Sequence, residues 1–162
     1  MKVCVLQPDY STTGVDYKNY DPPRDLSVLI PEAEVHTIFL NKLTTYKQLK
    51  QLSKDGYDIF VNLCEGYLEW EVPSIDVIYT LEILNLPFTG PTTKLYDPPK
   101  ELMKYLAYCE GVKTPGYVII NELNDVDDAV KHLLFPLFVK PAKAGDSLGV
   151  DCLLYTSDAA DE

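Results

Sequence analysis

Short apolar runs and helical periodicity alternate along the first part of the chain, and this alternation predicts an α/β layer fold. The runs at 2–8, 35–40 and 59–64 have the length and the content of Val, Ile and Phe that are typical of buried strands. Nearly every position of 59–64 is apolar, which indicates a central strand of a parallel sheet. A fourth, shorter strand is expected at 86–89.

Three helices are predicted between these strands. Residues 44–56 begin with two threonines that suit an N-cap and end at a glycine that suits a C-terminal stop. Residues 74–85 carry Ile and Leu at helical spacing, and a shorter helix near 26–30 is expected to end at Pro31. Right-handed crossovers between parallel strands then predict a small doubly wound parallel sheet.

The pattern changes at residues 96–99 (YDPP), where two prolines precede a new set of elements. Prolines at this position are typical of a helix start. We expect a helix at 98–111, a strand at 116–120, a helix at 124–134 and a strand at 134–139. This second set predicts a second unit that begins near residue 98.

The strand expected at 134–139 delivers Lys140 at its end, and a loop with Gly145, Ser147 and Gly149 follows. A lysine supplies a point charge, and glycine lets backbone N–H groups approach phosphate oxygens, so this stretch suits a polyphosphate ligand. A strand followed by a surface lysine and an ordinary turn explains the composition equally well. Neither GxxxxGK(S/T) nor GxGxxG is present, which excludes the two standard glycine motifs.

Bulk composition narrows the classes of function. The 162 residues carry a net charge of −11, which argues against nucleic acid or an anionic membrane as a partner. No apolar run approaches the roughly 20 residues that span a bilayer. The first residues lack the long apolar region of a signal peptide. We therefore expect a cytoplasmic protein without a membrane partner, and the sequence leaves its oligomeric state open.

The four cysteines lie far apart and form no CxxC pair, and the chain has only two histidines. This spacing is not that of a zinc site, and disulfides are not expected in a reducing compartment, so we predict no metal site from these residue types. Cys4 and Cys64 lie inside apolar runs and are predicted to be small buried hydrophobic residues.

Four fragments follow one another along the second half of the chain, and their order carries information about the family. They are LNLPFTGP at 84–91, a helix with Lys100 and Lys104, EGVKTPGYVI at 110–119, and LFVKPAKAGDSLGVD at 137–151. In order and spacing they resemble the ATP-grasp superfamily, and within it the D-alanine–D-alanine ligase-like branch. Each fragment alone is weakly specific, whereas four in sequence form a more specific signal. The sheet expected upstream fits the N-terminal domain of that family.

The resemblance implies a Rossmann-like N-terminal pre-ATP-grasp domain at 1–97 and the beginning of an α+β ATP-grasp lobe at 98–151. It implies an ATP-dependent ligase that joins a small-molecule carboxylate to an amine through an acyl phosphate, with ATP and Mg²⁺ as cofactors. The magnesium ligands of the family are expected beyond residue 151, so the chain by itself is expected to be inactive.

By the same resemblance, Lys140 matches the lysine that holds the phosphates of ATP, and Lys100 matches an earlier lysine with a similar role. Gly145, Ser147 and Gly149 match the glycine-rich loop that folds over the phosphates. Two cations and backbone donors neutralise charge on the phosphoryl group as it passes to a carboxylate. Without the resemblance, Lys100 is most simply a solvated residue in a first helical turn.

Three departures from the family pattern bear on the substrate. Asp146 replaces the first serine of the GSSxG loop, and the first loop (QPDYS, residues 7–11) lacks the substrate glutamate of the family. Cys64-Glu65-Gly66 stands in place of a His-Gly pair. ATP binding is therefore better supported than D-alanine as the substrate.

These departures leave several interpretations open. Asp9, Ser11 and Glu65 are candidates to contact a different amino acid or carboxylate, and solvation in a loop is the simpler role for each. A non-catalytic nucleotide- or metabolite-binding protein on the same scaffold is the alternative to a ligase. A sheet domain with only an interaction role is a third hypothesis.

Residues 152–162 (CLLYTSDAADE) break the family pattern, which continues with alternating apolar residues at this point. The string resembles one reading frame of a transposon-based sequencing adapter. We expect a non-native tail, which makes the family-like sequence the N-terminal fragment of a longer protein. A genuine acidic C-terminus is the alternative.

Overall fold

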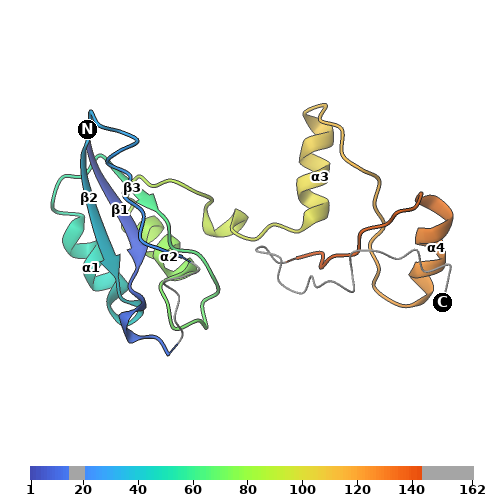
Figure 1. Cartoon of the computed structure of the whole chain (residues 1–162), viewed down its shortest axis with the longest axis horizontal. Helices are drawn as coiled ribbons and strands as arrows, with labels where there is room; N and C mark the ends of the chain where they lie inside the picture. The colour runs from blue at the N-terminus through green and yellow to red at the C-terminus, as the bar shows by residue number, and fades with distance from the viewer. Residues whose placement is uncertain (15–20, 144–162) are drawn as a thin grey trace. The chain divides into compact units, whose positions relative to one another are not determined.

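The structure is a computed structural model that describes residues 1–14 and 21–143 of the chain (Figure 1). The chain divides into two units, Met1–Tyr96 and Asp97–Glu162, and each is described by itself. The first unit contains a sheet with two α-helices, and the described part of the second contains two further α-helices. None of the helices described is long and apolar enough to cross a membrane.

A three-stranded parallel sheet forms the centre of the first unit, in the order β2–β1–β3 (Figure 1). β1 (Lys2–Pro8), β2 (Glu34–Leu40) and β3 (Ile59–Asn62) match the strands predicted from the apolar runs. The predicted fourth strand is reduced to one isolated parallel bridge between Phe60 and Phe88. The predicted α/β class with a small parallel sheet is confirmed.

The core of this unit lies between the sheet and two helices, α1 (Thr45–Leu52) and α2 (Ile75–Ile83), which contact each other. Alternate residues of β1 supply one side of the core, because successive side chains of a strand point to opposite faces of the sheet. Each large apolar side chain buried there contributes about 1.5–3 kcal/mol to stability. The buried cluster comprises Cys4, Leu6, Leu40, Leu49, Phe60, Cys64, Val77 and Leu81.

The prediction of a helix near residues 26–30 is wrong. The structure has a turn there, in which the N–H of Leu29 donates to the carbonyl oxygen of Leu26 at 3.0 Å. Val28 and Leu29 are each 72% exposed, so the segment buries no apolar face. Because helix nucleation is costly, a helix of this length does not form without such packing.

The second unit contains α3 (Lys100–Cys109) and α4 (Asn124–His132), close to the two helices predicted there. Its described residues include no strand, so the strands predicted at 116–120 and 134–139 are wrong. The physical reason is that an extended segment becomes a strand only where a neighbouring strand completes its hydrogen bonds. No described residue pairs with either segment in that way.

Contacts to α3 hold the extended segment that follows it. Lys104 Nζ donates to the carbonyl oxygen of Pro115 at 2.7 Å and lies 5.0 Å from the centroid of the Tyr117 ring. Part of α3 is open to solvent, because Leu106 is 50% exposed and Cys109 is also exposed. A lysine and a tyrosine therefore anchor this segment.

The prediction that Cys4 and Cys64 are buried is confirmed, since their exposed fractions are 0% and 2%. Burial raises the pKa of the Cys4 thiol from 9.0 to about 12, and the negative charge of Asp55 adds to the effect. The folded state keeps this proton at a pH where the unfolded state has lost it. The stabilisation that the thiol contributes is therefore complete below pH 9 and is lost as the pH rises toward about 12.

We predict that the free energy of unfolding of the wild type minus that of Cys4→Ala shrinks steadily between pH 9 and about 12. Urea denaturation at several pH values measures this difference. Cys109→Ala removes an exposed thiol and is the matched control, for which the same difference stays constant. A Cys4 difference as flat as that of the control would contradict the prediction.

Candidate functional site

The carboxyl ends of β1 and β3 are where this fold offers a ligand site. The chain passes from β1 to β2 on one side and then to β3 on the other, so its direction across the sheet reverses beside β1. Open parallel sheets bind ligands at such a reversal, beyond the carboxyl ends of the strands. The N–H of Leu63 donates to the carbonyl oxygen of Leu6 at 3.0 Å and holds the two strand ends together.

A buried glutamine holds the segment 21–24 against the end of β1. Gln7 is 3% exposed, and its Nε2 donates to the carbonyl oxygen of Arg24 while its Oε1 accepts from the Arg24 N–H, both at 2.8 Å. The guanidinium of Arg24 and the hydroxyl of Tyr10 both donate to the carboxylate of Asp21. Charged groups of both signs therefore lie near the carboxyl edge of the sheet.

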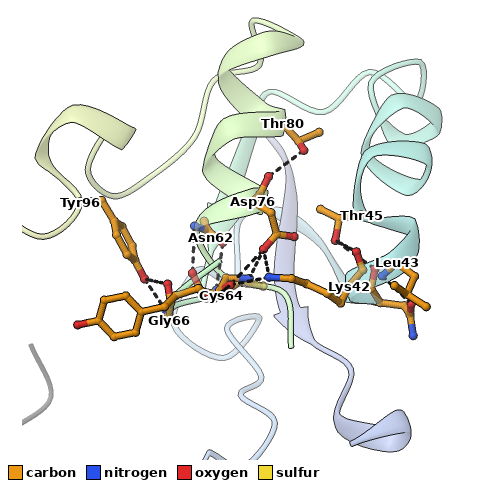
Figure 2. A network of polar contacts seen from close by, with 12 residues as sticks. Lys42, Leu43, Thr45, Asn62, Cys64, Gly66, Asp76, Thr80 and Tyr96 are labelled. Carbon is orange, nitrogen blue, oxygen red and sulfur yellow. Dashed lines mark hydrogen bonds and ion pairs between the residues drawn. The ribbon is translucent and has the colours of Figure 1, made fainter. Parts of the chain in front are cut away.

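Side chains on both sides fix the turn that follows β3 (Figure 2). Asn62 Oδ1 accepts from the N–H of Cys64 at 3.0 Å. The hydroxyl of Tyr96 accepts from the N–H of Gly66 at 2.5 Å and donates to its carbonyl oxygen at 3.0 Å. Gly66 has a φ of +122°, and a Cβ at this position would also collide with the ring of Trp70. Glycine is therefore required in the Cys64-Glu65-Gly66 turn.

An ion pair connects this turn to the two helices (Figure 2). Lys42 Nζ lies 2.6 Å from Asp76 Oδ1 and 2.8 Å from Ser74 Oγ. Ser74 Oγ also lies 2.7 Å from the carbonyl oxygen of Tyr67. Asp76 stands in the first turn of α2, where the helix dipole favours a carboxylate. Its Oδ2 is buried and has no hydrogen-bond partner among the described residues.

Cys64 is 2% exposed, and charged groups of these segments act on its thiol. Burial raises the pKa of the Cys64 thiol, the carboxylates of Asp76 and Asp21 raise it further, and the ammonium of Lys42 lowers it. A thiol whose pKa is raised stays protonated near pH 7, so Cys64 is not a nucleophile.

Three residues predicted as candidate substrate contacts lie at this edge, and the structure gives them different roles. The carboxylate of Asp9 caps the short helix η1 (Tyr10–Thr12) by accepting from the N–H of Ser11 at 2.9 Å, and hydrogen bonds from Ser11 lower the pKa of Asp9. Ser11 is exposed. Glu65 is exposed too, and no hydrogen bond or ion pair joins its carboxylate to another described residue.

The predicted phosphate-binding residues lie in the second unit. Lys100 is the first residue of α3, and its N–H donates to the carbonyl oxygen of Ala142 at 3.0 Å, which brings the helix start beside the segment that carries Lys140. Lys140 is exposed, follows no strand and has its Nζ 5.9 Å from the centroid of the Phe138 ring. Gly145, Asp146, Ser147, Gly149 and the tail at 152–162 lie outside the described residues.

Sequence reasoning does not single out Lys42, Asp76 or Tyr96, which hold the first unit's site together. Tyr96 is 30 residues from the glycine it binds, and Lys42 is 34 residues from Asp76, so no local pattern links the partners. A weak signal existed for Asp76, since an acid just after a serine N-cap is typical of a helix start. Within residues 1–14 and 21–143, no group of three His, Cys, Asp or Glu side chains could hold a metal ion.

The first unit is thus an α/β domain with a charged edge at the carboxyl ends of a parallel sheet, a class that binds small molecules there. Comparison with known proteins gives a closer relationship. The chain is 29% identical over 113 residues to a D-alanine–D-alanine ligase of Nitrosomonas eutropha, covering 68% of this chain and 36% of that relative. It is 39% identical over 92 residues to a D-alanine–D-alanine ligase of Helicobacter pylori, covering 51% and 26%.

A D-alanine–D-alanine ligase of Polynucleobacter asymbioticus is 39% identical over 72 residues, which cover 43% of this chain and 21% of the relative. These relatives confirm the predicted resemblance to the D-alanine–D-alanine ligase-like branch of the ATP-grasp superfamily. No protein-family model matches the chain. No solved structure matches it significantly. The chain spans 27% to 36% of the length of the first relatives it matches.

The ion pair of Lys42 supports a prediction about stability. The two side chains are 17% and 18% exposed, so Lys42→Met leaves the carboxylate of Asp76 poorly solvated and without its cation. We predict a loss of about 2 kcal/mol in the free energy of unfolding, which is less than for a fully buried pair. Urea denaturation at pH 7 measures the loss.

Lys47→Met is the matched control, because Lys47 is an exposed residue of α1 that forms no ion pair with another described residue. We expect this control to change the free energy of unfolding by less than about 0.5 kcal/mol. If the two variants unfold at the same urea concentration, the Lys42–Asp76 pair does not stabilise the fold.

Proposed function

We propose that the full-length protein is an ATP-dependent ligase that joins a small carboxylate to an amine. The observation that carries the proposal is the similarity to D-alanine–D-alanine ligases, which reaches 39% identity. In the proposed reaction, the γ-phosphoryl group of ATP passes to a substrate carboxylate. The resulting acyl phosphate is attacked by the amine, and inorganic phosphate leaves as the carbon–nitrogen bond forms.

The proposed roles in phosphate binding fall on the second unit. Lys100 and Lys140 hold the phosphates of ATP, and the loop with Gly145, Ser147 and Gly149 folds over them. The hydrogen bond from the Lys100 N–H to the Ala142 carbonyl oxygen supports this assignment, because it brings the start of α3 beside the Lys140 segment. Fixed cations aimed at the transferring group stabilise the charge that develops on it.

The proposal extends to the organisation of the chain. Residues 1–97 form the N-terminal domain of the ligase, residues 98–151 begin its ATP-grasp lobe, and 152–162 are a non-native tail. Mg²⁺ is the expected metal, held by oxygen ligands of the full-length protein beyond residue 151. The present chain alone is therefore expected to be inactive. The net charge of −11 supports a small-molecule ligand over nucleic acid or a membrane, and the cytoplasm is the proposed location.

A non-catalytic nucleotide- or metabolite-binding protein is the second candidate. Asp146 and the first loop at 7–11 favour it, because an acid stands in the phosphate loop and the substrate glutamate of the family is missing. Release of inorganic phosphate from Mg-ATP separates the two candidates. The ligase releases phosphate when D-alanine or another small amino acid is added, and the binding protein does not.

We predict that Lys140→Ala in the full-length protein weakens Mg-ATP binding by about 2 kcal/mol, roughly thirtyfold, because a charge-assisted contact to phosphate is lost. Isothermal titration calorimetry with Mg-ATP measures the affinity. Thermal unfolding of the variant is expected to be unchanged, since Lys140 is exposed.

Lys113→Ala is the matched control, because it removes another exposed lysine of the same unit. We expect its affinity for Mg-ATP to equal that of the wild type. Equal weakening by both substitutions would mean that net charge, not a specific site, governs binding, and full affinity in Lys140→Ala would remove Lys140 from the site.

A further inference from the structure

Tyr96 satisfies both backbone polar groups of one residue in the turn after β3. Its hydroxyl accepts from the N–H of Gly66 at 2.5 Å and donates to the carbonyl oxygen of Gly66 at 3.0 Å (Figure 2). A phenol uses its donor and one acceptor in this arrangement, so one side chain completes the hydrogen bonding that a second strand would otherwise supply. The contact bridges 30 residues and therefore restrains the turn from outside it.

The rest of the turn is restrained from the opposite side. The rings of Tyr67 and Trp70 pack edge to face with centroids 5.4 Å apart, and the N–H of Trp70 donates to the carbonyl oxygen of Tyr67 at 3.1 Å. The same carbonyl oxygen lies 2.7 Å from Ser74 Oγ, which belongs to the Lys42 ion-pair network. The backbone from 66 to 70 thus has partners on both sides.

Glu65 lies between the two restrained residues of this turn, Cys64 and Gly66. The N–H of its predecessor Cys64 is bound by Asn62, and both polar backbone groups of its successor Gly66 are bound by Tyr96. Its own carboxylate is exposed and makes no hydrogen bond or ion pair to a described residue. A fixed backbone with an uncommitted charged side chain, at the carboxyl end of β3, is the geometry of a contact residue.

We propose that Tyr96 is a positioning residue that holds Glu65 for contact with the ammonium group of an amino-acid substrate. This inference rests on the proposed function, because it assigns a substrate contact for the proposed ligase reaction. A carboxylate and an ammonium group form a charge-assisted hydrogen bond, which is about twice as strong as a neutral one. The strength of such a bond depends on placement, so releasing Gly66 weakens the contact without removing the Glu65 charge.

The test uses Tyr96→Phe in the full-length protein, which deletes one hydroxyl and keeps the ring. Phosphate release from Mg-ATP is measured with D-alanine and with the other small amino acids as probes. We expect the KM for the productive amino acid to rise about tenfold, with the KM for ATP unchanged. Tyr79→Phe removes the hydroxyl of an exposed tyrosine on α2 and should leave both constants at the wild-type values.

A double-substitution cycle separates positioning from a general loss of structure. Glu65→Gln alone is expected to raise the same KM, and Tyr96→Phe added to it should raise the KM little further, because both act on one contact. Independent, multiplying effects would overturn the proposal. An unchanged amino-acid KM in Tyr96→Phe would overturn it as well.

Amide hydrogen exchange keeps the test separate from the proposed function. Tyr96→Phe is expected to speed exchange at Gly66 by at least about tenfold while amides of β1 stay protected. Unchanged exchange at Gly66 would overturn the positioning role whatever the activity. A wild-type protein that releases no phosphate with any amino acid would refute the ligase and the substrate contact, whereas faster Gly66 exchange would still identify Tyr96 as the residue that holds the turn.

Discussion

The first unit depends on one strand, β1, being hydrogen-bonded along both edges. Lys2–Pro8 pairs in parallel with β2 over its whole length and with β3 over residues 3–6. Every residue from Val3 to Pro8 is buried, which only a central strand with both faces covered permits. The same double pairing creates the reversal of direction beside β1, so the strand that anchors the core also determines where a ligand can bind.

Polar contacts between distant residues give this edge its shape. Lys42, which precedes α1, pairs with Asp76 at the start of α2, and Tyr96 binds the turn after β3. Such contacts add little net stability when solvated, but they are costly to break once their partners are buried. The turn that carries Glu65 is therefore restrained by distant Tyr96 as well as by its own Gly66. Ligand contacts on a rigid frame require less ordering when the ligand binds.

The second unit also shows which elements form from local hydrogen bonds and which need a distant partner. Its helices formed where the sequence placed them, because helix hydrogen bonds are local. Its extended segments did not become strands, because no described residue pairs with them. A backbone hydrogen bond from Lys100 to Ala142 holds the segment that contains Lys140 beside the start of α3.

The sequence by itself determined the elements whose signals are local: three parallel strands, α1 to α4, the burial of Cys4 and Cys64, and the family-like fragments. The predictions from sequence were wrong for a helix at 26–30 and for strands at 116–120 and 134–139. In each case the apolar pattern had no partner among the described residues to pack or pair with. Tertiary structure alone decided which polar side chains meet. Tyr96 and Gly66 carry no sign of each other in the sequence, since a hydrogen bond across 30 residues exists only after the sheet has brought its ends together.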